Sequence, residues 1–160
     1  MTYYNDMFGR PYPFRKYDQV FVPEFNEGGM ENVGLITYAE DLLFRDETVT
    51  MAKKTELLIT VLHELAHMWF GDLVTMKWWN DLWLNESFAT YMSYIALTEI
   101  KDLHQYSNYA WLDFLDTKFE GVSNDQLLST HPICSDIKST DQVESIFDGI
   151  SYGKGASFLK

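Results

Sequence analysis

The stretch His63-Glu64-Leu65-Ala66-His67 decides the central element of this sequence, because it predicts both a helix and a metal site. A helix turns by about 100° per residue, so side chains four positions apart share a face and two histidines at this spacing can reach one ion. Glu64 then flanks the open side of that ion. A chance match to His-Glu-x-x-His in a chain of this composition is rare, at roughly 0.7 %. The pattern predicts that His63 and His67 bind zinc and that Glu64 is a general base.

A third zinc ligand is expected further along the chain, because catalytic zinc usually has three protein ligands and one open position. Glu86 fits this role, since 18 residues (86 − 67 − 1 = 18) separate it from His67, enough to end one helix and begin an antiparallel one. Asp72 is equally well placed to accept a hydrogen bond from a ligating histidine. The competing candidates for the third ligand are Asp72, Asp81, His104 and His131. Of these, the two histidines are expected to be ordinary exposed residues.

Composition narrows the class of protein. A length of 160 residues, with 46 % hydrophobic and 16 % aromatic residues, predicts one globular domain with a real core. The net charge of −12 argues against a nucleic-acid partner and suits a cationic ligand. The single cysteine, Cys134, excludes a disulfide within the chain and favours a cytoplasmic location. No membrane segment is predicted, because no run approaches the roughly 18 apolar residues of a span.

The first part of the chain is expected to form short strands. Residues 17–25 alternate polar and apolar side chains and predict a strand that ends near Pro23. Gly28-Gly29 marks a turn or bulge. Residues 34–38 predict a second short strand, antiparallel to the first or continuing it at a sheet edge.

Helical patterns follow the strands. Residues 51–70 predict the helix that carries both histidines, with Thr50 as N-cap and Gly71 as its stop. A second helix is expected over 80–99, capped near Asn80 or Asp81, with small residues beside Glu86 that allow close approach to the first. The remaining predictions are a helix over 101–119, mostly irregular chain over 122–152 with turns near 124–129 and 141–147, and the start of a helix at 153–160. Strands first and helices afterwards indicate the α+β class.

Four segments follow one another in a recognisable order: Gly28-Gly29-Met30-Glu31-Asn32, residues 63–72, residues 82–89, and Ile150-Ser151-Tyr152-Gly153-Lys154-Gly155 within 147–155. In residues, order and approximate spacing they resemble the catalytic domain of the aminopeptidase N type enzymes of peptidase family M1, which are gluzincins. The resemblance implies a thermolysin-like zinc metalloprotease domain, in which short N-terminal strands precede the helices of the zinc site. It also implies that residues 1–160 are part of this domain, with a flanking N-terminal β-domain and C-terminal helical domain outside the sequence.

The same resemblance implies roles for individual residues. Glu31 would bind the free α-amino group of the substrate, which is largely cationic at neutral pH. Tyr152 would stabilise the oxyanion of the transition state. Gly29 departs from the commoner Ala, and Val33 stands where Trp or Pro is expected. The implied substrate-binding edge, along which the peptide backbone would run, consists of Gly28, Gly29, Met30, Glu31 and Asn32.

These observations predict an aminopeptidase with one zinc ion per chain. It would remove the N-terminal residue from peptides with a free N-terminus, using a zinc-activated water and Glu64 as general base. One alternative is an epoxide hydrolase similar to the leukotriene hydrolases, which the Gly29 variant suggests. The other alternative is a zinc-dependent peptide-binding module without turnover.

Overall fold

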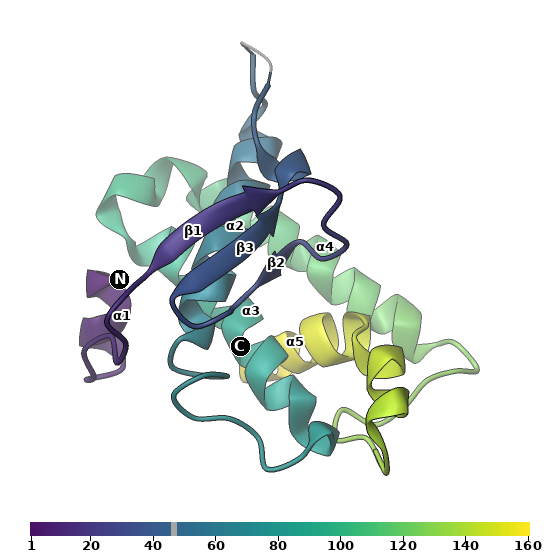
Figure 1. Cartoon of the computed structure of the whole chain (residues 1–160). Helices are drawn as coiled ribbons and strands as arrows, with labels where there is room; N and C mark the ends of the chain where they lie inside the picture. Colours follow the sequence, from purple (N-terminus) through teal and green to yellow (C-terminus); the bar gives the residue numbers. More distant parts are fainter. Residues whose placement is uncertain (46–47) are drawn as a thin grey trace.

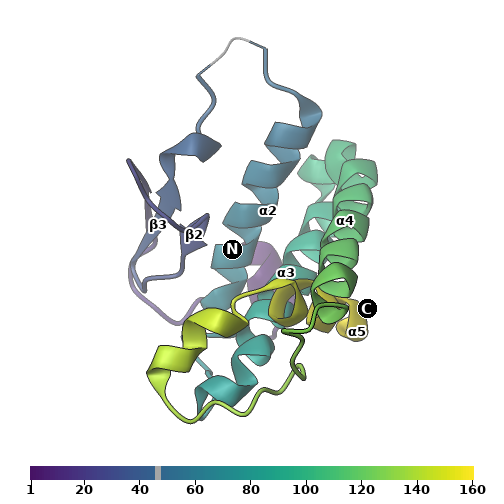
Figure 2. The ribbon, with the colours of Figure 1, turned by 90° about the vertical axis from the view of Figure 1, so that its right-hand side faces the viewer.

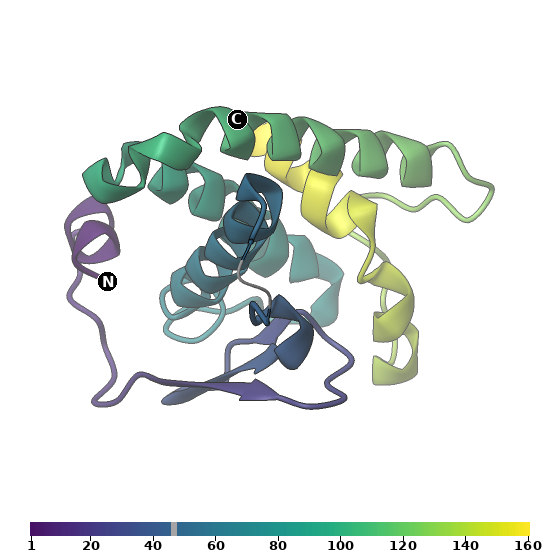
Figure 3. The ribbon, with the colours of Figure 1, turned by 90° about the horizontal axis from the view of Figure 1, so that it is seen from above.

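Helix α2 (Met51–His67) lies at the centre of the molecule, between a small sheet and the other long helices. The computed structural model describes residues 1–45 and 48–160. Figure 1 shows the sheet in front of α2, Figure 2 shows the same layers from the side, and Figure 3 shows α4 on the opposite side. The sequence predicted the α+β class, and the structure confirms a mixed architecture in which a small sheet precedes the main helices.

The sheet has three strands: β1 (Asp18–Val22), β2 (Gly29–Met30) and β3 (Leu35–Ala39), in the order β1-β3-β2. β1 and β3 run parallel, so the prediction of an antiparallel or continuous second strand is wrong. The reason is the connection over 23–34, which carries the chain past β3 to the far edge of the sheet. There β2 runs antiparallel to β3 before the chain turns back at Gly34, whose φ is 84°. Parallel neighbours need a connection of about this length.

Helix α2 begins as the sequence predicts. The Thr50 side chain accepts a hydrogen bond from the backbone N–H of Lys53 at 3.3 Å, which is the expected N-cap. The regular helix ends at His67, earlier than the predicted Phe70. Gly71 has a φ of 139°, a conformation open to glycine, and turns the chain away from the helix axis.

Helix α3 (Leu82–Glu99) follows a 3-10 turn at Trp79–Asp81. Its N-cap position is Asp81, as expected, although the Asp81 side chain makes no capping hydrogen bond. Ala89 and Ser93 are fully buried, so small side chains do lie on the face that approaches α2. Most of this helix is buried, because α2, α4 and the C-terminal segment surround it.

Helix α4 (Ser107–Asp125) follows a 3-10 turn at Lys101–Tyr106 and continues past the predicted end at 119. The prediction of irregular chain at 122–123 is therefore wrong, and the helical turn predicted near 124–129 begins as the last turn of α4. The predicted turns near 141–147 are confirmed as a 3-10 helix at Thr140–Ile146. A π-helical turn at Ile150–Lys154 then leads into α5 (Gly155–Leu159), and both lie against other helices. Tertiary packing of this segment on α4 explains why α4 is longer than its sequence pattern predicts.

The main core joins α1 (Thr2–Met7), β3, α2, α3 and α4. No pattern in the sequence predicted α1. Its Tyr4 is 1 % exposed, and the Tyr4 hydroxyl lies 3.1 Å from the carbonyl oxygens of both Leu62 and Met92, so α1 ties α2 to α3. Among the described residues, the structure contains no helix of the length and hydropathy that a bilayer crossing requires.

Candidate active site

Helices α2 and α3 bring the three predicted ligands together. His63 Nε2 lies 3.0 Å from His67 Nε2, and Glu86 Oε2 lies 3.3 Å from His63 Nε2 and 3.4 Å from His67 Nε2. His67 and Glu86 are buried and His63 is partly buried. The two imidazoles of α2 and the Glu86 carboxylate of α3 thus form a triangle of ligand atoms, which we call the ligand triangle. It lies at the base of a cavity.

This triangle has dimensions that suit a tetrahedral zinc ion. Zinc lies about 2.0–2.2 Å from histidine nitrogen and carboxylate oxygen, so ligand atoms at tetrahedral corners are about 3.3 Å apart. The observed separations of 3.0 to 3.4 Å match this spacing. His63, His67 and Glu86 could therefore hold a metal ion.

Hydrogen bonds orient the two imidazoles. His67 Nδ1 lies 2.9 Å from the Phe70 carbonyl oxygen and donates to it, which leaves Nε2 as an electron-pair donor toward the ion. His63 Nδ1 lies 3.4 Å from Thr90 Oγ1. Asp72 does not take the role considered for it, because the Phe70 carbonyl is the partner of His67. Gly71 also lies against the ring, because a Cβ at this position would come within 3.0 Å of His67 Nδ1.

Glu64 lies beside the triangle and is 5 % exposed. Burial raises the pKa of Glu64 to about 8; His67 opposes this shift, and Glu31 and Glu86 add to it. A Cβ at Gly29 would overlap the Glu64 carboxylate, so glycine at this position lets β2 lie directly against the predicted base.

The charged neighbours of Glu86 and His67 shift the pKa of each residue. Burial acts to raise the pKa of Glu86, but the His67 charge and hydrogen bonds from both histidines outweigh it and hold the pKa well below its ordinary value. Burial acts to lower the pKa of His67, and the carboxylates of Glu86, Glu31 and Glu64 raise it to about 10. The acidic surroundings therefore favour a cation at this point.

The predicted substrate edge lies on one wall of a cavity of about 330 Å³. Gly29, Met30 and Glu31 line this cavity, and Glu31 Oε1 lies 3.9 Å from His67 Nδ1. Gly28 precedes β2 and Asn32 is exposed, with its side-chain amide donating to Thr37 Oγ1 at 3.3 Å. That hydrogen bond joins the end of β2 to β3. Asn32 thus supports the strand in this structure.

Tyr152 lines the same cavity from the π-helical turn. Its ring stacks against His63, with ring centroids 6.0 Å apart. Burial and the Glu86 carboxylate raise the pKa of Tyr152, so the phenol is a hydrogen-bond donor at neutral pH. Three further lining residues were not predicted, because they lie in loops and short turns without a periodic pattern: Glu27, Glu144 and Phe147.

The turn that carries Tyr152 depends on close packing at Gly153. A Cβ at this position would overlap the carbonyl oxygen of Thr117 in α4. Replacing Gly153 by Ala is expected to lower the free energy of unfolding by about 1–3 kcal/mol, measured by denaturant unfolding. Gly28→Ala is the matched control, since nothing lies within 4 Å of its Cβ position. Equal stability of the two variants would contradict this packing argument.

The two histidines outside the triangle differ in their surroundings. His104 is exposed, as expected. His131 is not an ordinary exposed residue: it is partly buried, and its Nε2 lies 3.0 Å from Asp148 Oδ2. The loop over 126–139 folds back onto the start of the π-helical turn, and this tertiary contact has no local signal in the sequence.

Comparison with known proteins gives the family. The Peptidase family M1 domain matches residues 1–160. The chain belongs to peptidase family M1. M1 peptidases are metallopeptidases, and the triangle of His63, His67 and Glu86 is where this member could hold its metal.

Individual M1 relatives are similar over the whole chain. The chain is 52 % identical to aminopeptidase N of Streptomyces lividans over 99 % of its own length and 18 % of that protein. It is 47 % identical to aminopeptidase M1-B of Oryza sativa subsp. japonica, over 98 % of the chain and 18 % of the relative. It is 49 % identical to tricorn protease-interacting factor F2 of Thermoplasma acidophilum, over 100 % of the chain and 20 % of the relative. The chain thus spans about a fifth of the length of these M1 relatives.

Proposed function

We propose that this chain forms the zinc-binding part of a thermolysin-like metalloprotease domain, and that the protein is an aminopeptidase. One observation carries the proposal: the His63, His67 and Glu86 ligand atoms converge within 3.4 Å of one another in a cavity that Glu31 and Glu64 also line. The names of the relatives support it, since two of the three described above are aminopeptidases.

The proposed chemistry divides among the residues around the cavity. Zinc, when bound, would polarise the scissile carbonyl and make water a better nucleophile. Glu64 accepts a proton from the attacking water and delivers it to the nitrogen of the leaving amine. Tyr152 donates a hydrogen bond to the former carbonyl oxygen as negative charge develops there.

Glu31 accounts for the choice of a free N-terminus. It lies at the end of β2, on the wall of the cavity, so its carboxylate can pair with an α-ammonium group while the peptide backbone runs along the strand. β2 lies at the edge of the sheet, where an added strand can pair with it. In the proposed function, an ammonium held by Glu31 would place the first peptide bond of the substrate at the ligand triangle.

The experiment compares an aminoacyl chromogenic amide with the same amide after acetylation of its α-amine. The wild-type protein is expected to cleave the free amine and not the acetylated compound. Replacing Glu31 by Gln is expected to lower kcat/KM for the free amine by about 10–100-fold, because the amide oxygen of glutamine can still accept a hydrogen bond but lacks the negative charge that pairs with the ammonium. Glu24→Gln, at an exposed position in the loop before β2, is the control and should leave kcat/KM unchanged.

Each other outcome favours a different function. Equal cleavage of both amides would remove Glu31 from its role and favour an endopeptidase. Bound zinc without cleavage of either amide would favour a peptide-binding module.

A further inference from the structure

Asp148 lies just before the π-helical turn that carries Tyr152, and it accepts hydrogen bonds from three backbone amides of that turn. Asp148 Oδ1 accepts hydrogen bonds from the N–H groups of Ile150 at 2.9 Å and Ser151 at 3.2 Å. The Asp148 carbonyl oxygen accepts a third from the N–H of Tyr152 at 3.1 Å. The position of the Tyr152 backbone therefore depends on the position of Asp148.

The second carboxylate oxygen of Asp148 is held by His131. His131 Nε2 lies 3.0 Å from Asp148 Oδ2. The other ring nitrogen, Nδ1, lies 2.8 Å from Ser135 Oγ and 2.8 Å from the Pro132 carbonyl oxygen. Both ring nitrogens of His131 are thus engaged, which fixes the plane of the ring and the place of the carboxylate beyond it.

Ser135, His131 and Asp148 have the composition of a nucleophilic triad, but their surroundings favour a structural connection. Ser135 is 5 % exposed, and its hydroxyl lies within 3.0 Å of the Pro132 carbonyl as well as beside His131. A buried hydroxyl with two local partners is poorly placed to attack a substrate. The hydrogen bonds lead instead toward the turn of Tyr152.

We propose that His131 and Asp148 are positioning residues that set the place of the Tyr152 phenol over the cavity. This inference rests on the proposed function, in which Tyr152 stabilises the transition state. Neither residue lines the cavity that contains the ligand triangle. Asp148 does line a neighbouring cavity, together with Glu64 and Tyr152. The effect of His131 on turnover is expected to pass through Asp148 and the backbone of the turn.

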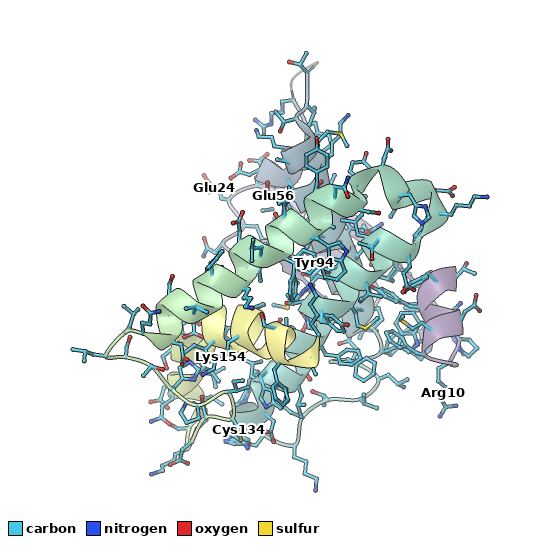
Figure 4. All side chains as sticks on the ribbon, turned by 180° about the vertical axis from the view of Figure 1, so that it is seen from behind. Arg10, Glu24, Glu56, Tyr94, Cys134 and Lys154 are labelled. Atoms are coloured by element: carbon cyan, nitrogen blue, oxygen red, sulfur yellow. The ribbon has the colours of Figure 1, made fainter. Side chains whose placement is uncertain are left out.

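Other contacts hold the same turn to the helices, so loss of His131 should shift the turn without releasing it. Lys154 Nζ lies 2.8 Å from Asp125 Oδ1 of α4, and Figure 4 shows Lys154 beside this helix. The N–H of Gly149 donates to Asn124 Oδ1 at 3.0 Å. Ser87 in α3 donates to the Ser151 carbonyl. His131 is distinct from these, because it connects the turn to the loop over 126–139.

The test is a double-mutant cycle in the full-length, zinc-loaded protein. His131→Leu is expected to lower kcat by about 10–100-fold, with KM within about twofold and zinc content unchanged. His131→Gln, whose amide can still donate to Asp148, should recover most of the loss. In a Tyr152→Phe background, His131→Leu should cause almost no further loss, because the group that it positions is already gone. His104→Leu, at an exposed site, is the control.

Hydrogen exchange gives a readout that does not depend on activity. His131→Leu should speed exchange of the Ile150 and Ser151 amides and leave the amides of α2 unchanged. Unchanged exchange at these amides, or equal losses from His131→Leu with and without the Tyr152 hydroxyl, would overturn the positioning role. A wild-type protein that binds zinc and cleaves no amide would overturn the proposed function instead.

Discussion

Glu64→Gln is expected to retain zinc and to lose catalytic turnover by about 10²–10⁴-fold, the usual contribution of a general acid–base group. Glutamine has nearly the size of glutamate but cannot accept the proton of the attacking water. Glu64 is not one of the three residues of the ligand triangle, so the substitution leaves the three proposed ligand atoms in place. Burial and the carboxylates of Glu31 and Glu86 raise the pKa of Glu64 toward the neutral range, in which one carboxyl group can both accept a proton and return it.

The measurement is kcat for an aminoacyl amide beside the zinc content of the same preparation. Glu56→Gln is the matched control, because Glu56 is an exposed glutamate on the same helix. It should keep both zinc and activity. Hydrolysis at the wild-type rate by Glu64→Gln would exclude Glu64 as the base.

His67→Ala is expected to weaken zinc binding by more than about 100-fold and to abolish hydrolysis. Substitution of a residue that merely orients a ligand already costs about 10–100-fold in metal affinity, and a ligand contributes more. His67 is 1 % exposed and lies among Glu31, Glu64 and Glu86. Its removal leaves the charge of these buried carboxylates less well compensated, so part of the effect will be lower stability.

Removing the metal and adding it back distinguishes a loss of zinc binding from a loss of stability. A chelator should abolish the activity of the wild-type protein, and added zinc should restore it, with bound metal measured by elemental analysis. His67→Ala should regain neither zinc nor activity at the same zinc concentration, whereas His104→Ala should behave as the wild type. A His67→Ala protein with full zinc content and normal turnover would show that His67 is not a ligand.

The sequence predicted those parts of the fold that depend on local patterns. Thr50 begins α2 as expected, because a side-chain hydroxyl before an amphipathic run is a local capping signal. The pairing of β1 with β3 was predicted wrongly, because strand direction depends on where residues 23–34 travel in space. The length of α4 depends on packing against residues 149–154, and no pattern within α4 encodes that contact.

In the candidate site, too, local patterns predicted some residues, and tertiary contacts decide the others. His63 and His67 are four residues apart, so helix geometry alone places them on one face, and the structure brings Glu86 to them. The contact of His131 with Asp148 could not be predicted, because it joins an irregular loop to a turn 17 residues later in the chain. Glu27 and Glu144 line the cavity for the same reason, through loop geometry that sequence periodicity does not report.

The shortness of β2 has a consequence for how a long peptide would be shortened. β2 spans only Gly29–Met30, so pairing with it would read the first positions of a peptide and few of the later ones. If the proposed function is correct, the peptide left after one cut would present a new end of the same kind, and trimming would continue one residue at a time. Proline near the new end lacks an N–H group and has a fixed φ, which opposes pairing with a strand. Trimming would therefore pause where proline reaches this edge.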